Sequence, residues 1–180
     1  MTQPSLLHYI ETGQLVFREG SIVFFGYNMI FTPTRTMALI RHLLLENYGD
    51  KATDVLYKGG YGHLKHIFGT FSSKFDLSKM DQKTFLDLFT PSGQTLGLGE
   101  FKVISLNPKT GLTVLTSNNN PFAQTYKEMY GKQEKGVDDF IRGMIAYLSE
   151  AFSKKQATCE ETKCIAKGDK YCEFITKPKK

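Results

Sequence analysis

Three cysteines, Cys159, Cys164 and Cys172, lie close together near the carboxyl end, and the rest of the chain contains none. Gly168 and Asp169 stand between the second and the third of them, with apolar or β-prone residues on both sides. A Gly-Asp pair between two such runs predicts the turn of a β-hairpin. That turn places Cys164 and Cys172 opposite each other, so their side chains meet.

Glu161 comes three residues before Cys164 and is the natural third group in this corner. Two thiols and a carboxylate can together bind a divalent ion such as zinc, although the spacing is not that of a standard zinc finger. Three other interpretations stay open. The cysteines could be ordinary small core residues. They could form a cross-hairpin disulfide, which a reducing cytosol disfavours, or a redox dithiol without the usual CxxC spacing.

No other motif indicates catalysis. His63 and His66 are one helical turn apart, a spacing that can ligate a metal but is more often a solvated pair, and no third ligand accompanies them. The chain contains no GxGxxG, GxxxxGK(S/T) or GxSxG motif, so nucleotide-binding and hydrolase functions lack support. The glycines between residues 59 and 62 fall inside a helical pattern, which disfavours a phosphate-binding loop. We therefore assign no catalytic residue.

The composition is that of a single folded domain over residues 1–180, with an N-terminal helical segment (1–12) and a basic tail (176–180). Hydrophobic residues make up 41% of the chain, with 14 Phe and 9 Tyr. Lys and Arg outnumber Asp and Glu by 23 to 18, but this excess is spread out, so we expect no nucleic-acid partner. The chain lacks a secretory signal and any apolar run near the roughly 18 residues of a spanning helix, so we expect a cytoplasmic protein without membrane insertion.

Hydrophobic periodicity and turn residues predict short strands alternating with amphipathic helices. Helices are expected over residues 33–48, 52–68, 78–89, 121–130 and 137–152. Strands are expected over residues 15–17, 22–25, 29–31, 100–106 and 112–117, followed by the cysteine hairpin. Three hairpins separated by helices indicate an α+β fold, with helices packed on a small antiparallel sheet.

Several aromatic and methionine side chains lie near the second hairpin and the last two helices. Such residues are usually core, but they can also line a cavity for a flat hydrophobic ligand. The candidate ligand-binding residues are Phe101, Phe122, Tyr126, Phe140, Met144 and Tyr147.

Two patterns precede and support a specific motif at the carboxyl end: the run Asn120-Pro121-Phe122-Ala123, a helix containing Gly143, and then Glu161-x2-Cys164-x3-Gly168-Asp169-x2-Cys172-x-Phe174. Together they resemble the 4-vinyl reductase domain family. This family includes the effector-sensing domains of phenol- and xylene-responsive bacterial activators, stand-alone hydrocarbon-binding proteins and a protein linked to bacteriochlorophyll vinyl reduction. Its fold is similar to that of the vesicle-tethering TRAPP subunits.

The resemblance implies a structural zinc site. In the sensor members, zinc is held by a cysteine at the start of the last long helix and by the Glu and two Cys of the hairpin, which correspond here to Glu161, Cys164 and Cys172. Asp138 stands where those members have the first cysteine. Either Asp138 supplies an oxygen ligand, or Cys159 substitutes for it, or the site holds no metal. A bound ion would tie the hairpin to the helix as a staple.

The resemblance also implies a function. We expect a domain that binds and senses a hydrophobic or aromatic small molecule, forms a homodimer and signals through another protein, because no effector domain follows Lys180. An enzyme or accessory acting on a tetrapyrrole vinyl group is an alternative, although no flavin or nicotinamide fingerprint is present. A TRAPP-like interaction scaffold is a second alternative, which predicts a filled core in place of a cavity.

Overall fold

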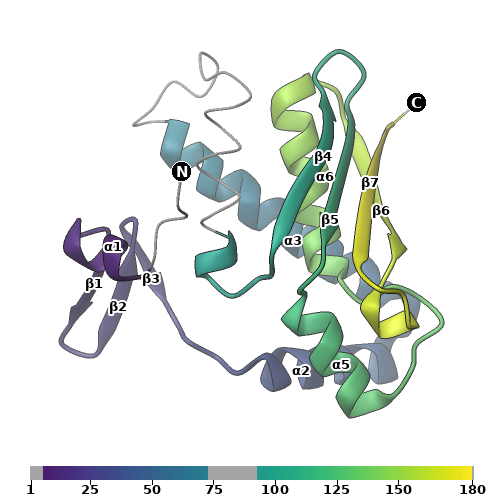
Figure 1. Cartoon of the computed structure of the whole chain (residues 1–180), viewed down its shortest axis with the longest axis horizontal. Coiled ribbons are helices and arrows are strands. Elements are labelled where there is room, and N and C mark those ends of the chain that lie inside the picture. The colour runs from purple at the N-terminus through teal and green to yellow at the C-terminus, as the bar shows by residue number, and fades with distance from the viewer. Residues whose placement is uncertain (1–5, 73–92, 180) are drawn as a thin grey trace.

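The computed structural model describes residues 6–72 and 93–179, and it confirms an α+β fold (Figure 1). The helix predicted over residues 78–89 lies outside the described residues. The described helices are α1 (Leu6–Glu11), α2 (Thr34–Tyr48), α3 (Asp50–Ser72), α5 (Pro121–Tyr130), α6 (Asp139–Ser153) and the short 3-10 helix η2 (Ile165–Lys167). The strands are β1 (Leu15–Arg18), β2 (Ser21–Phe24), β3 (Tyr27–Met29), β4 (Phe101–Asn107), β5 (Leu112–Ser117), β6 (Ala157–Lys163) and β7 (Cys172–Pro178).

Strands β1, β2 and β3 form a small antiparallel sheet near the amino end. The expected hairpin between β2 and β3 is present, but its turn comes earlier than predicted. Phe25 and Gly26 both adopt left-handed backbone conformations, with φ of 50° and 83°, and Phe24 pairs directly with Tyr27. Two consecutive left-handed residues make the two-residue turn that matches the twist of a hairpin. Tyr27 therefore starts the next strand and is not part of the turn.

The other two predicted hairpins join in one four-stranded antiparallel sheet with the order β4-β5-β7-β6. Strand β5 lies in its interior and pairs with β4 on one side and with β7 on the other. Phe174 of β7 is fully buried, and Leu115 of β5 is nearly so. Helix α6 packs one side against β6 and β7 and the other side against α3 (Figure 1). The sheet thus fixes α6, and α6 carries several of the residues described below.

Helices α3 and α6 cross at two glycines. A Cβ atom added to Gly60 would lie 1.9 Å from the backbone oxygen of Phe140, and one added to Gly143 would lie 1.9 Å from the backbone oxygen of Tyr57. Only glycine allows the two backbones to approach so closely. This contact explains why the chain accepts glycines inside α3, where each costs about 1 kcal/mol of helix propensity.

Helix α5 begins with a side-chain cap that the sequence predicted. Asn120 is the N-cap residue and its side-chain oxygen accepts a hydrogen bond from the backbone N–H of Ala123 at 2.9 Å, with Pro121 in the first turn. An asparagine cap followed by proline is a strong helix start, because proline has the required φ and lacks the N–H that would be unpaired there. Asn120 is itself completely buried.

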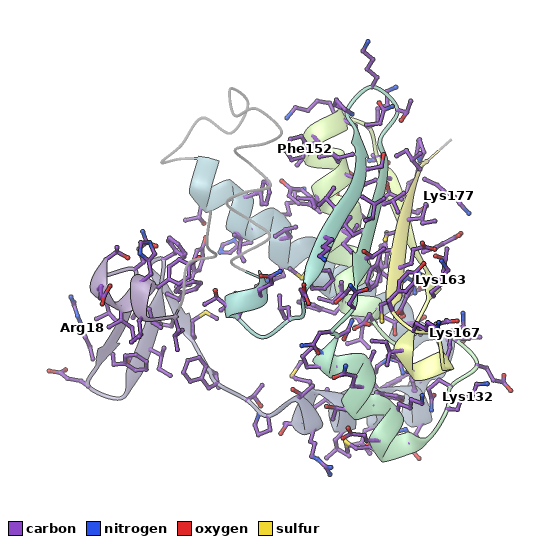
Figure 2. All side chains as sticks on the ribbon, viewed as in Figure 1. Arg18, Lys132, Phe152, Lys163, Lys167 and Lys177 are labelled. Atoms are coloured by element: carbon purple, nitrogen blue, oxygen red, sulfur yellow. The ribbon has the colours of Figure 1, made fainter. Side chains whose placement is uncertain are left out.

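Lysines lie along the outer edge of the large sheet, where Figure 2 labels Lys163, Lys167 and Lys177. Lys163 pairs with Glu173 at 3.2 Å, and Lys177 pairs with Glu160 at 2.7 Å. These positive charges are thus partly balanced by carboxylates on neighbouring strands. Among the described helices, none is long and apolar enough to cross a lipid bilayer.

Candidate metal site and ligand cavity

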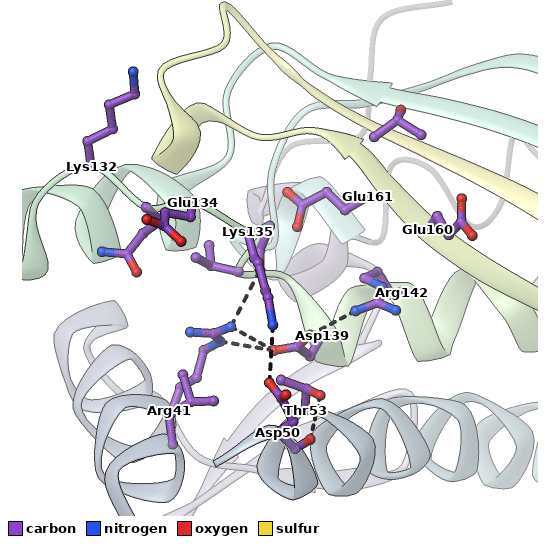
Figure 3. A pocket seen from close by; sticks show the side chains of 15 residues that line it. Arg41, Asp50, Thr53, Lys132, Glu134, Lys135, Asp139, Arg142, Glu160 and Glu161 are labelled. Atoms are coloured by element: carbon purple, nitrogen blue, oxygen red, sulfur yellow. Dashed lines mark hydrogen bonds and ion pairs between the residues drawn. The ribbon is translucent and has the colours of Figure 1, made fainter.

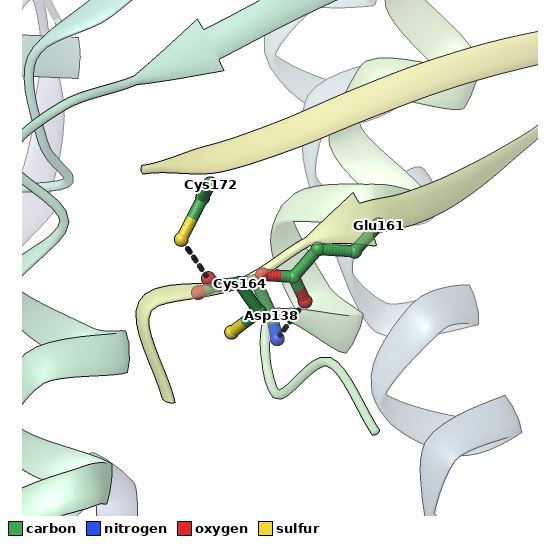
Figure 4. A group of neighbouring side chains, drawn as sticks. All are labelled: Asp138, Glu161, Cys164 and Cys172. Carbon is green, nitrogen blue, oxygen red and sulfur yellow. Dashed lines mark hydrogen bonds between the residues drawn. The ribbon is translucent and has the colours of Figure 1, made fainter. Parts of the chain in front are cut away.

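Four side chains from separate elements meet at one point beneath the large sheet (Figure 4). Asp138 immediately precedes α6, Glu161 lies on β6, Cys164 follows β6, and Cys172 begins β7. One potential ligand atom from each residue can be chosen so that all four atoms lie within 4.8 Å of one another. Both cysteines are completely buried and Asp138 is 2% exposed. The structure therefore brings together the four residues that the resemblance suggested.

The connection between β6 and β7 differs from the predicted two-residue turn. After Cys164 the chain enters the 3-10 helix η2, which ends at Gly168 with a left-handed φ of 99°. The carboxylate of Asp169 accepts a hydrogen bond from the backbone N–H of Cys164 at 2.8 Å. The sulfur of Cys172 accepts one from the backbone N–H of Ile165 at 3.4 Å. The longer loop folds back on itself, and these bonds direct both sulfur atoms inward.

Each carboxylate in the group is held by one oxygen and leaves the other without a partner. Oε2 of Glu161 accepts the backbone N–H of Asp138 at 3.0 Å, and Oδ2 of Asp138 accepts the side-chain N–H of Asn120 at 2.8 Å. Oδ1 of Asp138 and Oε1 of Glu161 are buried and have no hydrogen-bond partner among the described residues. Gly136 makes room for the Glu161 carboxylate, since a Cβ there would lie 2.3 Å from its Oε2.

Buried polar atoms are normally hydrogen-bonded, because leaving them unpaired costs free energy. Two unpaired carboxylate oxygens beside two buried sulfur atoms form a set of donors suited to a divalent cation. Two thiolates and two carboxylates are ligands that zinc accepts, and four protein ligands are typical of a closed structural site. The residues present therefore fit a zinc ion.

Burial and mutual repulsion oppose the ionisation of these groups when no cation is near. Burial, followed by the nearby charge of Cys164, raises the pKa of Asp138 to about 7. Burial, followed by the charge of Asp138, raises the pKa of Glu161 to about 10. A hydrogen bond with Cys172 lowers the pKa of Cys164 to about 5, and the same bond raises the pKa of Cys172. A divalent cation would remove this opposition by compensating the charges.

Cys159 is not part of this group. It is buried on β6, its backbone N–H donates to the hydroxyl of Tyr57 at 3.1 Å, and burial raises the pKa of its thiol to about 12. All three cysteines are free thiols. Asp138, and not Cys159, is the residue that the fold places beside Glu161, Cys164 and Cys172.

The residue after Asp138 anchors the start of α6 through buried ion pairs (Figure 3). Asp139 is bound by Arg41 of α2 at 2.9 Å and by Arg142 of its own helix at 2.9 Å. Arg41 also lies over the ring of Tyr126, 4.8 Å from its centroid. These groups border a charged cavity of about 650 Å³ that also reaches Glu161. The ion pairs link α2 and α5 to the segment that carries Asp138.

Replacing Arg41 with methionine is expected to destabilise the fold by about 3 kcal/mol, because it leaves the buried Asp139 carboxylate only partly compensated. Lys135→Met is the matched control. Lys135 pairs with Asp50 at 3.2 Å, but the two side chains are 79% and 88% exposed, whereas those of Arg41 and Asp139 are 6% and 2% exposed. We expect the control to change stability by less than about 0.5 kcal/mol. Urea unfolding of both variants tests the difference, and equal losses would contradict the assigned role of Arg41.

A second, largely apolar cavity of about 400 Å³ lies on the other side of the same segment. It is bounded by the stretch after β3, by α2, α3 and α6, and by residues 96–98. Its size and lining are those of a small-molecule site. The lining includes Ile30, Phe31, Met37, Ile40, Leu56, His63, Leu96, Leu98, Phe122, Val137, Phe140, Ile141 and Met144.

The predicted ligand-binding residues fall into two groups. Phe122, Phe140 and Met144 line the apolar cavity. The other three do not line it: Phe101 packs near Phe174, Tyr126 packs between Phe122 and Tyr130, and Tyr147 packs against Tyr61 and Phe68.

Sequence reasoning missed the residues that α2, α3 and the preceding stretch contribute to the cavity. Ile30 and Phe31 are strongly exposed although they are large and apolar. Their position just before Pro33, outside any strand or helix, was the available signal. His63 supplies a polar group to the lining, and its ring centroid lies 5.6 Å from that of Phe140. Partial burial, with His66 nearby, lowers the pKa of His63 and favours its neutral form.

The segment Val137–Asp139 forms a common wall between the metal-ligand group and the apolar cavity. All three of its residues border the cavity, and the middle one, Asp138, belongs to the four-residue group. A molecule in the cavity therefore lies directly against the backbone that positions Asp138.

Comparisons with known proteins agree with this arrangement. The phenol-responsive sensory domain of the transcription activator PoxR, in a crystal structure with phenol, has a TM-score of 0.77 and 17% sequence identity, covering 93% of this chain and 86% of that chain. A vinyl-4-reductase family protein from Methanocaldococcus jannaschii has a TM-score of 0.54 and 18% identity, covering 84% of this chain and 85% of that chain.

The expected likeness to a TRAPP subunit is also found, at a lower score. Trafficking protein particle complex subunit 3 from Naegleria fowleri, in a structure with covalently bound palmitic acid, has a TM-score of 0.47 and 18% identity, covering 82% of this chain and 95% of that chain. Sequence comparison with curated proteins gives no match.

A family model for the 4-vinyl reductase domain matches residues 116–178. This range contains nearly all of the cysteine hairpin together with α5 and α6, and thus all four residues of the metal-ligand group. The predicted resemblance is therefore confirmed, and the carboxyl-terminal part of this chain carries the 4-vinyl reductase domain signature.

Proposed function

We propose that this protein is a sensor module that binds a hydrophobic small molecule in the apolar cavity. The observation that carries the proposal is the cavity of about 400 Å³ bordered by α2, α3 and α6, with Phe122, Phe140 and Met144 in its wall. A filled core, as an interaction scaffold would require, does not account for this space. The similarity in fold to a phenol-responsive sensory domain supports the same interpretation.

We further propose that Asp138, Glu161, Cys164 and Cys172 hold a structural zinc ion. Zinc would supply a cross-link between the cysteine hairpin and the start of α6, without an open position for chemistry. Because residues 137–139 also border the cavity, a bound small molecule would stabilise one packing of α6 against the hairpin. A ligand that prefers one packing shifts the population toward it.

The output is proposed to pass through a contact with another chain, and a homodimer is the simplest case. Large apolar side chains remain exposed on the outer surfaces of α2 and α3, among them Leu39, Leu43, Tyr48 and Val55. Exposed apolar groups of this kind mark protein contacts when they are contiguous. Measuring the molar mass in solution with and without ligand tests this part of the proposal.

A thermal-shift experiment with the zinc-loaded protein tests ligand binding, with phenol, 2-naphthol and pyrene as probes. A probe at about 100 times its Kd would stabilise the fold by about 2.7 kcal/mol, which corresponds to a rise in Tm of about 5–10 °C for a chain of this size. Native mass spectrometry of protein purified from its own host would report metal, bound molecule and subunit number together. No shift with any hydrophobic probe and no bound molecule would overturn the proposal.

Two substitutions on one helix locate the binding. Met37→Trp is expected to fill the cavity and to weaken probe binding at least about tenfold, because the larger ring takes the space of the ligand. Leu39→Trp is the matched control, since Leu39 is on the same helix, is 45% exposed compared with 46% for Met37, and does not line the cavity. Isothermal titration with the best probe compares the two. A loss for Leu39→Trp with binding retained by Met37→Trp would place the ligand elsewhere.

A further inference from the structure

Asn120 connects the start of α5 to the proposed metal ligand Asp138. Its side-chain nitrogen donates to Oδ2 of Asp138 at 2.8 Å, while its side-chain oxygen accepts the backbone N–H of Ala123 at 2.9 Å. Asn120 has no exposed surface, and Asp138 is 2% exposed. Both ends of the amide are thus used in a buried place, so that its orientation is fixed.

The hydrogen bond decides which oxygen of Asp138 is available. A carboxylate has two equivalent oxygens and can rotate, unlike a thiolate, which offers a single sulfur atom. Asn120 occupies Oδ2, and Oδ1 remains buried without a partner among the described residues. Glu161 is held in the same manner, with Oε2 bound to the backbone N–H of Asp138 and Oε1 unpaired. Each acid therefore has one oxygen fixed and one oxygen left for a cation.

We propose that Asn120 is a positioning residue of the metal site, which orients the Asp138 carboxylate so that Oδ1 acts as the ligand. This inference rests on the proposed zinc site. Partners that hold a metal ligand in place commonly contribute 10–100-fold to metal affinity, because they fix the direction of the ligand. A cysteine at position 138 would offer one sulfur atom and no second ligand atom to choose between. The role of Asn120 thus belongs to the aspartate found in this chain.

The two roles of Asn120 can be separated by substitution. Asn120→Asp preserves the size of the side chain and an oxygen that can cap α5, since aspartate and asparagine are about equally good N-cap residues. It replaces the N–H donor with a second acceptor that faces Asp138. The change therefore removes the orientation of Asp138 and leaves the start of the helix intact.

A double-mutant cycle tests the proposal with three variants, Asn120→Asp, Asp138→Cys and the combination of both. Zn²⁺ and Co²⁺ affinities are measured by competition with a chelator, and the visible absorption of bound Co²⁺ reports the ligand geometry. We expect Asn120→Asp alone to weaken metal binding about 10–100-fold and to change the Co²⁺ spectrum. In the Asp138→Cys background the same substitution is expected to change affinity less than about threefold, because sulfur needs no such orientation.

The outcomes distinguish this inference from the zinc site on which it rests. Equal losses in both backgrounds would show that Asn120 acts only through helix α5 and would overturn its positioning role. Unchanged affinity and spectrum for Asn120→Asp would overturn it as well, while leaving the metal site intact. Failure of the unaltered protein to bind Zn²⁺ or Co²⁺ would overturn both.

Discussion

Replacing Cys172 with serine is expected to abolish tight zinc binding and to lower the thermal stability of the protein. The sulfur of Cys172 is completely buried among Asp138, Glu161 and Cys164, and a serine hydroxyl is a much poorer ligand for zinc than a thiolate. A site saturated at about 1,000 times its Kd contributes about 4 kcal/mol to stability. The corresponding fall in Tm is about 8–16 °C. Zinc content of the purified protein and a thermal melt provide the two measurements.

Cys159→Ala is the control for this prediction. Cys159 is as deeply buried as Cys172 and lies in the same hairpin, but it is outside the metal-ligand group. We expect this variant to lose some stability through the small cavity it creates and to retain about one zinc per chain. If instead Cys159→Ala loses zinc and Cys172→Ser retains it, the assignment of the ligands is wrong.

Replacing Gly60 with alanine is expected to destabilise the protein by about 3 kcal/mol or more. The added methyl group would lie 1.9 Å from the backbone oxygen of Phe140, and a backbone atom cannot move aside as a flexible side chain can. Helices α3 and α6 would have to separate, which disrupts well-packed contacts along both. Urea unfolding of the variant measures the loss.

Gly62→Ala in the same helix provides the comparison. No atom lies within 4 Å of the position of an added Cβ at Gly62, and alanine favours a helix over glycine by about 1 kcal/mol. This variant is therefore expected to be as stable as the unaltered protein or up to about 1 kcal/mol more stable. Similar stabilities for the two variants would mean that α3 and α6 do not cross at Gly60.

The same crossing also shapes the ligand cavity. His63 of α3 and Phe140 of α6 both line the cavity, and their ring centroids are 5.6 Å apart. A helix separation caused by Gly60→Ala would move these walls apart. We therefore expect that variant to bind the hydrophobic probes less tightly, in proportion to its structural change.

Short-range features of the fold follow from the sequence because a few adjacent residues determine them. The run Asn120-Pro121 specifies the start of α5, and residues 112–117 form the predicted strand. The segment from Glu161 to Cys172 brings its acid and its two thiols together through its own loop. The predicted loop type was wrong, because the Gly-Asp pair fits both a two-residue turn and the end of a 3-10 helix. Either geometry turns the chain back on itself.

Tertiary structure alone decided what lies opposite each of these features. The resemblance indicated Asp138, but only packing shows that Asn120 takes one of its oxygens and that Asp139 binds Arg41 from α2. The glycines of α3 indicated a close approach without naming α6 as the partner.

The cavity is the clearest case of this division. An apolar stripe shows that a side chain leaves water, yet it does not show whether that side chain meets another atom or an open space. Phe122 and Tyr126 lie on the same short helix, and one borders the cavity whereas the other is in the core. The sequence thus determined the hairpin, the caps and the fold class. The positions of α2, α3 and α6 relative to one another, which depend on contacts between distant residues, determined where a ligand could fit.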